Sequence, residues 1–213
     1  SQFLEPDGTF PNHIPNPENK DAMASVCAAV EAHEADFLII FDTDVDRAGC
    51  VGKGGYEINR NRLVALAAAI CLEDNEDAVI VTDSITSDGL TEFIESRSGK
   101  HLRYMRGYKN VINKQVELTE SGVNCPLAIE TSGHAAFLEN YFLDDGAYLV
   151  TKIIIEMAKL GRQGLSIEDL IADLREPLEE AELRFPINAA DFKSCGEAVI
   201  HAIDELAQKT SGW

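Results

Sequence analysis

The chain has 213 residues, of which 45% are hydrophobic, so it is long enough to bury one large core or two smaller ones. Its formal net charge of -19 argues against nucleic acid as a partner, because binding phosphates along a strand takes an excess of Lys and Arg. It has no apolar run long enough to span a membrane, and its cysteines are scattered without a CxxC pair. We therefore expect a cytoplasmic protein with reduced thiols and with no nucleic-acid or membrane partner.

The predicted elements begin with a proline-rich loop and a helix over 17–34, with Asn16 as its N-cap. The apolar run Phe37–Phe41 is typical of a strand covered on both faces, and 48–58 reads as a hairpin. Further strands are predicted at 78–82, 101–105, 126–130 and 179–187, and helices at 59–72, 88–96, 110–121, 146–161 and 191–208, with a short one after Ser166. This alternation predicts an α/β fold of α/β/α layered domains with mixed, largely parallel sheets.

Three aspartates, Asp42, Asp44 and Asp46, follow the Phe37–Phe41 strand at intervals of two residues, and Arg47 comes next. Carboxylates this close repel one another, so either a cation offsets them or water solvates them fully. In a loop they can converge on one hard cation, and oxygen donors suit Mg²⁺ or Ca²⁺. An EF-hand is excluded, because its sixth position would have to be Gly and is Arg47 here. A cation site and a solvated acidic turn remain as the alternatives.

Two further polar clusters follow predicted strands. The string "ETSGH" comes after the strand at 126–130, and its Glu130 and Ser132 can bind sugar hydroxyls. Its His134 can contact a phosphate or transfer a proton near neutral pH, although a polar turn is the alternative for the whole string. The string "RGYK" places Lys109 after a glycine turn, where a surface lysine is the alternative to a ligand. Carboxyl ends of parallel strands share one edge of a sheet, where ligands collect.

Taken together, these motifs resemble those of the α-D-phosphohexomutases, the phosphoglucomutase/phosphomannomutase family. The family's metal loop reads DGDGDR where this chain has "DTDVDR", and its sugar loop reads GEMSGH where this chain has "IETSGH". The strings "FPNHIPNPEN", "RGYKNVI" and "LDDGAYLVTKIIIEMA" also match family segments in order and spacing. The resemblance covers nearly the whole chain.

The resemblance implies a role for each candidate residue. The three aspartates would hold Mg²⁺, as cofactor of an enzyme that interconverts hexose 1-phosphate and hexose 6-phosphate through a phosphoserine and a bisphosphate intermediate. Arg47 and His134 would be catalytic, Arg47 toward the phosphate and His134 toward a proton or phosphate. Glu130, Ser132 and Lys109 would bind the hexose phosphate, and Glu130 and Ser132 are expected to face solvent.

The chain also departs from the family pattern. Thr43 and Val45 replace the loop glycines, so the backbone there is expected to avoid positive φ. The family's phosphoserine loop, which reads like TASHNP, and its RPSGTEP-like phosphate loop do not occur in this sequence. We therefore expect an internal fragment that is inactive by itself and whose partners are the remaining domains of the parent. In it, 1–56 would be the second half of domain II, 57–178 domain III and 179–213 the start of domain IV.

Two alternative functions remain at this point. A haloacid-dehalogenase-type phosphatase would use Asp42 as nucleophile and the acidic pair in "LDD" (143–145), but it leaves "ETSGH" unexplained. A non-catalytic, metal-dependent module that binds sugar phosphates would use the same residues without phosphoryl transfer. Phosphoryl turnover would separate the second alternative from an enzyme.

Overall fold

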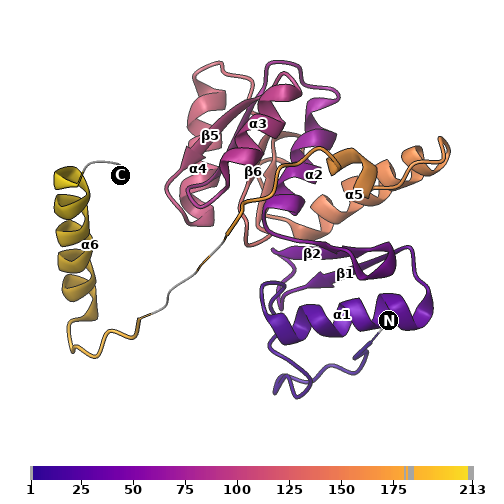
Figure 1. Ribbon diagram of the computed structural model, residues 1–213, viewed down its shortest axis with the longest axis horizontal. Coiled ribbons are helices and arrows are strands. Elements are labelled where there is room, and N and C mark those ends of the chain that lie inside the picture. The colour runs from indigo at the N-terminus through magenta and orange to yellow at the C-terminus, as the bar shows by residue number, and fades with distance from the viewer. Residues whose placement is uncertain (1, 180, 182–184, 211–213) are drawn as a thin grey trace. The chain divides into compact units, whose positions relative to one another are not determined.

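The structure is a computed structural model that describes residues 2–179, 181 and 185–210. The chain divides into two units, Ser1–Pro177 and Leu178–Trp213, which are described separately. The first unit contains both sheets and helices α1 to α5 (Figure 1). Among the described residues, no helix is both long enough and apolar enough to cross a lipid bilayer.

The first sheet is antiparallel, with strand order β1-β2-β3, and one helix precedes it. These elements are α1 (Lys20–His33), β1 (Phe37–Phe41), β2 (Ala48–Gly52), the 3₁₀ turn η1 (Lys53–Gly55) and β3 (Glu57–Ile58). Strands β1 and β2 are paired from Phe37↔Gly52 to Phe41↔Ala48, so the turn between them holds 42–47. The register therefore places the three aspartates together at one end of a hairpin.

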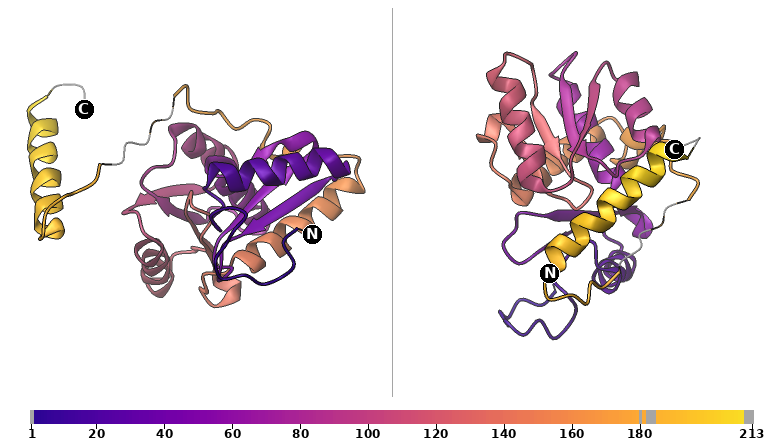
Figure 2. Two further views of the ribbon diagram at one scale, coloured as in Figure 1. Left: turned by 90° about the horizontal axis from the view of Figure 1, so that it is seen from below. Right: turned by 90° about the vertical axis from the view of Figure 1, so that its left-hand side faces the viewer.

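Both faces of this first sheet are covered, which explains the continuous apolar run of β1. Ile40 and Val51 pack against α1, which lies across one face of the sheet (Figure 2). Ala48 and Cys50 belong instead to the main core, to which Ile39 contributes from β1. Because neighbouring residues of a strand point to opposite faces, a strand covered on both sides needs apolar residues at every position.

The second sheet has strand order β5-β4-β6-β7, with β5, β4 and β6 parallel and β7 antiparallel. Its strands are β4 (Val79–Asp83), β5 (Lys100–Tyr104), β6 (Leu127–Ile129) and β7 (Ala135–Phe137). The other helices of the first unit are α2 (Asn61–Leu72), α3 (Asp88–Ser96), α4 (Tyr108–Glu120) and α5 (Gly146–Gly161), with 3₁₀ turns η2 (Leu138–Asn140) and η3 (Glu168–Ile171). The predicted α/β fold is confirmed.

Helices cover both faces of the second sheet, which gives an α/β/α arrangement (Figure 1). Ile80 of β4 packs in the main core with α2, α3 and α5, whereas Val81 packs on the opposite face with Val111 of α4. Helix α2 is buried along almost its whole length, from Leu63 to Leu72. A helix that is apolar all round is stable only inside a core, and α2 contributes to the core between both sheets.

Several boundaries differ from the sequence prediction for local reasons. Helix α1 begins at Lys20 because Asn19, not Asn16, caps it by accepting a hydrogen bond from the Ala22 N–H at 3.0 Å. Asn59 does not cap α2, since its side-chain amide donates to the carbonyl of Pro17 at 3.0 Å. Strand β7 was not predicted, because three small or apolar residues after a tight turn carry little periodic signal.

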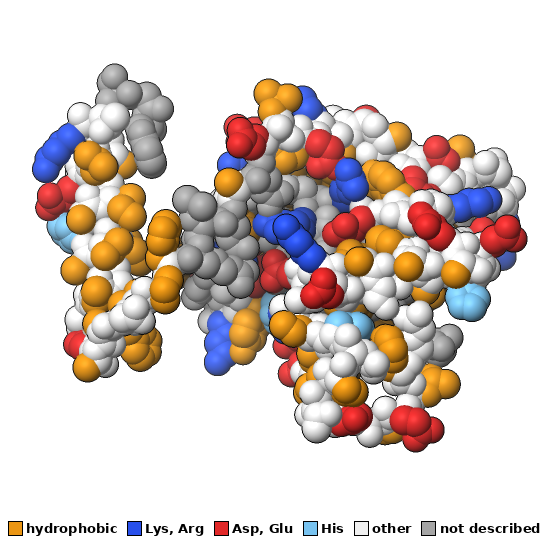
Figure 3. Space-filling model, turned by 60° about the horizontal axis from the view of Figure 1, so that its bottom comes forward, with side chains coloured by type: hydrophobic (Ala, Val, Ile, Leu, Met, Phe, Trp, Pro, Cys, Tyr) orange, Lys and Arg blue, Asp and Glu red, His pale blue; other side chains and the backbone are white. Residues whose placement is uncertain are grey.

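The second unit contains one helix, α6 (Phe192–Lys209), capped by Asp191, among the residues described there. The strand predicted at 179–187 falls partly outside the described residues, and those described within it are not in a strand. No residue of α6 is buried, and hydrophobic side chains lie along the face that Figure 3 displays. The most exposed are Ile200, at 69%, and Phe192, at 66%.

Candidate functional site

The candidate site lies where the carboxyl ends of the parallel strands meet the β1–β2 turn. Asp83 ends β4, Gly107 comes shortly after β5, and the ETSGH loop (Glu130–His134) follows β6. The aspartate loop (Asp42–Arg47) reaches the ETSGH loop, because an isolated antiparallel bridge joins the last residues of the two loops. The fold therefore brings both candidate clusters to one sheet edge, as expected for ligand sites in such sheets.

The close approach of the two loops depends on glycine. Gly133 has φ 97 and its carbonyl accepts from the Ala48 N–H at 3.3 Å, while a Cβ on Gly133 would clash with the carbonyl oxygen of Ala48. Gly146, the first residue of α5, donates its N–H to the carbonyl of Val45 at 3.0 Å. Only glycine allows backbones to come this close, so both glycines fix the aspartate loop in place.

The aspartate loop brings its three carboxylates together. One oxygen from each of Asp42, Asp44 and Asp46 lies within 4.8 Å of the others, although Asp42 is buried and Asp44 is exposed. Val45 adopts φ 65, so the expectation that this loop avoids positive φ is wrong. This left-handed conformation of Val45 reverses the chain between Asp44 and Asp46. A β-branched residue disfavours it, and the hydrogen bond from the Gly146 N–H to the Val45 carbonyl helps to hold it.

Arg47 is the counter-charge for Asp42. Its Nε donates to Asp42 Oδ2 at 2.7 Å, and its backbone N–H donates to Asp42 Oδ1 at 3.2 Å. Burial raises the pKa of the Asp42 carboxyl, but these hydrogen bonds outweigh burial and hold that pKa below its usual value. Asp42 therefore stays ionised near neutral pH. The remaining lone pairs of its oxygens are available to a cation.

The charge of Asp46 is less well compensated than that of Asp42, because the nearest cationic nitrogens, Arg47 Nε and His134 Nδ1, lie 3.8 Å and 3.7 Å from its oxygens. Burial, together with the nearby Asp42 carboxyl, raises the pKa of Asp46 to about 6. Its Oδ1 is buried and has no hydrogen-bond partner among the described residues. A cation bound between the three carboxylates would satisfy this oxygen and remove the repulsion. The all-oxygen donor set suits Mg²⁺ or Ca²⁺, so the residues present fit the Mg²⁺ that the family resemblance implies.

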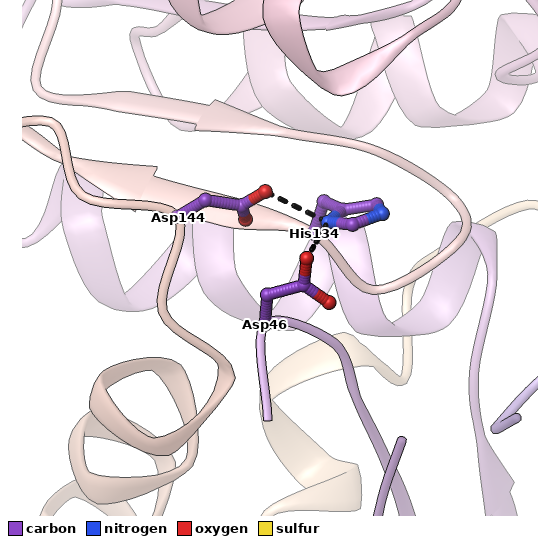
Figure 4. Close-up of side chains that lie close together, drawn as sticks. All are labelled: Asp46, His134 and Asp144. Carbon is purple, nitrogen blue, oxygen red and sulfur yellow. Dashed lines mark hydrogen bonds and ion pairs between the residues drawn. The ribbon is translucent and has the colours of Figure 1, made fainter. Parts of the chain in front are cut away.

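His134 lies between two carboxylates from different segments (Figure 4). Its Nδ1 donates to Asp144 Oδ2 at 2.8 Å and lies 3.7 Å from Asp46 Oδ2. Burial lowers the pKa of His134, but the hydrogen bond to Asp144 and the two negative charges outweigh it and raise that pKa above its usual value. The ring of Tyr108 stacks on the imidazole at 5.0 Å between centroids. His134 is therefore held in one orientation with a tendency to be protonated.

The ETSGH loop is less accessible than the sequence suggests. Glu130 is 5% exposed and Ser132 is 8% exposed, so the expectation that both face solvent is wrong. Glu130 Oε1 accepts the backbone N–H of Gly107 at 2.6 Å, and burial raises the pKa of this carboxyl. Ser132 Oγ has no hydrogen-bond partner among the described residues and is buried. The loop thus offers a carboxylate, which the segment after β5 covers through Gly107, and a buried hydroxyl without a hydrogen-bond partner among the described residues.

Lys109 belongs to the segment that encloses this loop. It is the second residue of α4 and is exposed, with its ammonium nitrogen 5.8 Å from the ring centroid of Tyr108. Tyr108 in turn stacks on His134, so Lys109 lies near the site. Among the described residues, no hydrogen bond or ion pair joins Lys109 to the ETSGH loop. The structure thus places it at the periphery of the cluster.

Three site residues were not identified from the sequence as members of this cluster. Asp144 binds His134, Tyr108 stacks on it, and Asp83 binds Thr131 of the ETSGH loop with both carboxylate oxygens. A charged residue ending a buried apolar strand was the available signal for Asp83. Asp144 was visible only as one member of the acidic pair in "LDD".

The geometry does not favour Asp42 as a phosphatase nucleophile. Both of its oxygens accept hydrogen bonds from Arg47, and the residue is 7% exposed. An attacking oxygen needs open access to phosphorus, which the burial of Asp42 and its hydrogen bonds to Arg47 restrict. Asp42 also follows β1, which pairs with β2 in the antiparallel sheet, so it does not end a strand of the parallel sheet.

Comparison with known proteins gives consistent matches. The family models described as phosphoglucomutase/phosphomannomutase, alpha/beta/alpha domain II and domain III match residues 1–55 and 59–178. A phosphomannomutase/phosphoglucomutase of Pseudomonas syringae is 31% identical over 209 residues, and a phosphoglucomutase of Neisseria meningitidis is 32% identical over 208. The matches cover 98% and 97% of this chain, and the chain spans 42% of the length of each relative.

Solved structures show the same likeness. The crystal structure of a phosphoglucomutase/phosphomannomutase family protein from Burkholderia thailandensis is 32% identical, with a TM-score of 0.68 over 80% of this chain and 35% of that one. A putative phosphomannomutase from Thermus thermophilus, at 18% identity and a TM-score of 0.62 over 75% of this chain and 35% of that one, shares the fold.

Proposed function

Because this chain belongs to the phosphoglucomutase/phosphomannomutase family, we propose that it carries the metal and sugar loops of a Mg²⁺-dependent phosphohexomutase. Such an enzyme interconverts hexose 1-phosphate and hexose 6-phosphate through a phosphoserine and a bisphosphate intermediate. The observation that carries the proposal is the direct contact of the two loops, in which Asp46 Oδ2 lies 3.7 Å from His134 Nδ1. One bound substrate can therefore touch both loops at once.

In this proposal the aspartate loop binds the ion and the phosphoryl group. Asp42, Asp44 and Asp46 each supply a carboxylate oxygen within reach of one Mg²⁺. When bound, Mg²⁺ supplies positive charge that offsets the charge of the phosphoryl group during transfer. Arg47 orients Asp42 through its Nε and leaves its other guanidinium nitrogens to hold a phosphate oxygen.

The ETSGH loop would bind hydroxyl groups of the sugar. The Glu130 carboxylate accepts hydrogen bonds from hydroxyls, and the unsatisfied Ser132 hydroxyl donates or accepts one. Since both are nearly buried, binding requires Gly107, which donates to Glu130, to give way to the sugar. Two adjacent sugar hydroxyls can be bound alike after the bisphosphate has turned round, which lets one loop serve both half-reactions.

His134 would act at the boundary between phosphate and sugar. Asp144 fixes its Nδ1 and favours its protonated form, so the opposite ring nitrogen, Nε2, can donate a hydrogen bond or a proton to a substrate oxygen. Lys109, exposed at the start of α4, would add positive charge for the distal phosphate.

The isolated chain is expected to be inactive, because the string that carries the family's phosphoserine does not occur in it. Without that donor, no group can store a phosphoryl between half-reactions. In this form the chain would be a metal-dependent module that binds sugar phosphates. The test is a coupled assay for conversion of glucose 1-phosphate or mannose 1-phosphate, with Mg²⁺ and the corresponding 1,6-bisphosphate.

The assay should compare this chain with the polypeptide encoded by the complete open reading frame. We expect turnover in the complete polypeptide, reduced at least about a hundredfold by Asp44→Ala, which is the scale for losing a group that stabilises transition-state charge. We expect no turnover by the chain alone. Turnover by the 213-residue chain above that of its own Asp44→Ala variant would contradict the mechanism.

A further inference from the structure

Asp83 is a carboxyl group buried at the end of the central strand of the second sheet. It is 0% exposed, and both of its oxygens bind one residue: Oδ1 accepts the Thr131 N–H at 3.3 Å, and Oδ2 accepts the Thr131 hydroxyl at 2.8 Å. Burying a carboxyl group costs free energy that a well-packed apolar residue would not cost. Packing alone therefore does not account for an aspartate at this position.

The residue that Asp83 holds is the centre of the ETSGH loop. Thr131 is 1% exposed and lies between Glu130 and Ser132. Its N–H belongs to the peptide group that joins it to Glu130, so a hydrogen bond to this N–H restrains the backbone next to the Glu130 side chain. The loop has a second restraint at the opposite side, where Gly107 donates to Glu130 Oε1 at 2.6 Å. The backbone of the loop is also held by the Glu130 N–H, which donates to the His134 carbonyl at 2.9 Å, and by the Gly133 N–H, which donates to the Glu130 carbonyl at 3.0 Å. The contacts of Thr131 and Gly107 add the restraints that define the direction of the Glu130 side chain.

Asp83 also sets the charge at this end of the site. Burial raises the pKa of Asp83, and burial together with the nearby Asp83 raises the pKa of Glu130, while the positive charge of Arg106 opposes the increase in both. Two neighbouring carboxyl groups repel phosphate oxygens but accept hydrogen bonds from hydroxyls. This end of the site therefore suits the hydroxyl end of a hexose phosphate and disfavours its phosphate.

We propose that Asp83 is a positioning residue that fixes Thr131 and thereby aims Glu130 and Ser132 at the hydroxyl groups of a hexose phosphate. This role rests on the proposed function of the ETSGH loop. Asp83 itself does not touch the sugar, because its two oxygens are occupied by Thr131 and it is fully buried.

The experiment is a titration of the 213-residue chain with glucose 1-phosphate and Mg²⁺, followed by NMR, for wild type and Asp83→Asn. Asparagine has the same shape, but its amide group can accept hydrogen bonds through only one of its two terminal atoms. We expect Asp83→Asn to weaken the affinity for glucose 1-phosphate about tenfold, and to speed hydrogen exchange at the Thr131 amide by a similar factor.

The matched control is Glu156→Gln. Glu156 is also a nearly buried carboxylate, at 3% exposure, but it lies on α5 and binds Lys159 at 2.7 Å. We expect this variant to lower the urea midpoint without changing either the affinity for glucose 1-phosphate or exchange at Thr131. All titrations are run well below the thermal midpoint of the least stable variant, so that a merely structural loss does not alter the measured affinity.

The outcomes separate this inference from the proposed function. If wild type does not bind glucose 1-phosphate, the proposed function of the loop fails. If wild type binds it and folded Asp83→Asn binds it within twofold, with unchanged exchange at Thr131, the positioning role is wrong. Should Asp83→Asn not fold, Thr131→Val and Thr131→Ser decide: loss of affinity only in the valine variant supports the role, and equal affinities overturn it.

Discussion

Asp42 and Asp46 show how two chemically identical side chains, four residues apart, reach opposite electrostatic states. Arg47 holds the pKa of Asp42 below its usual value, whereas burial raises the pKa of Asp46 to about 6. The difference comes from geometry, since the Arg47 Nε lies 2.7 Å from Asp42 and 3.8 Å from Asp46. A cation in the aspartate loop would chiefly stabilise the ionised form of Asp46.

Removing one carboxylate should therefore weaken the metal site. We expect Asp44→Ala to reduce Mg²⁺ affinity at least about tenfold, because it removes one of three anionic donors. Isothermal titration calorimetry, or Mn²⁺ binding followed by electron paramagnetic resonance, measures the change. Asp36→Ala is the matched control, since Asp36 is exposed at the opposite end of β1. Equal Mg²⁺ affinity in the two variants would remove Asp44 from the site.

His101 makes a separate prediction about pH. Its ring nitrogens bond to the Thr82 and Thr91 hydroxyls, each at 2.7 Å, and burial lowers the pKa of His101 from 6.5 to about 4. As pH falls, His101 therefore binds a proton in the unfolded chain before it does so in the folded chain. The contribution of neutral, buried His101 to the unfolding free energy is complete above pH 6.5 and is lost as pH falls toward 4. The loss amounts to about 3 kcal/mol of unfolding free energy.

The measurement is urea unfolding of wild type and His101→Gln between pH 7 and pH 4.5. We expect the unfolding free energy of wild type to fall more steeply with decreasing pH than that of the variant. His201→Gln, on the exposed helix α6, is the control and should follow the wild-type curve. Parallel curves for wild type and His101→Gln would show that His101 does not carry this dependence.

At the scale of elements, the site depends on the turn of one sheet docking onto the loop of another. The aspartate loop contacts the ETSGH loop through the bridge between Arg47 and His134, and it contacts the start of α5 through the Gly146 N–H. Neither loop is held by its own strands alone. The position of the carboxylates therefore depends on α5 as well as on the hairpin that carries them.

Gly146→Ala tests this docking. A Cβ at Gly146 would lie 2.8 Å from the carbonyl carbon of Arg47 and 2.9 Å from the carbonyl oxygen of Val45, so the aspartate loop must shift. We expect a loss of about 2 kcal/mol in unfolding free energy, the scale for overpacking, together with weaker Mg²⁺ binding. Urea unfolding and calorimetry measure the two effects.

The control for this variant lies in the same helix. Gly161 ends α5, and a Cβ there meets no atom within 4 Å. Gly161→Ala should therefore raise the unfolding free energy by roughly 0.5 to 1 kcal/mol through helix propensity, and leave Mg²⁺ binding unchanged. If Gly146→Ala behaves like Gly161→Ala, the contact between α5 and the aspartate loop does not hold the site.

At the scale of the molecule, every candidate residue lies in the first unit, whereas the second unit has a helix with no buried residue. Exposed apolar side chains on α6 contribute little free energy of folding, since hydrophobic stabilisation follows the apolar area removed from water. The core that supports the site is formed by the two sheets and α1 to α5.

Truncation after Pro177 tests this division. We expect the 1–177 chain to show the same thermal midpoint for the first unit and the same Mg²⁺ affinity as the 213-residue chain. Differential scanning calorimetry and metal titration provide the comparison. A markedly lower midpoint, or loss of Mg²⁺ binding on truncation, would show that residues 178–213 stabilise the site.

The sequence by itself determined the features that depend on neighbouring residues. The apolar run Phe37–Phe41 and the spacing of the three aspartates are local features, so periodicity and spacing predict them. The α/β fold also follows, because alternating strands and helices allow few arrangements.

Only the tertiary structure decided which side chains meet and which are covered. Asp83 and Thr131 are 48 residues apart, and His134 and Asp144 are 10 apart, so no local pattern pairs them. The burial of Glu130 and the positive φ of Val45 likewise result from other segments, the one after β5 and the start of α5. Contacts between distant segments add free energy that overrides local preference, which is why these features could not be predicted from the sequence.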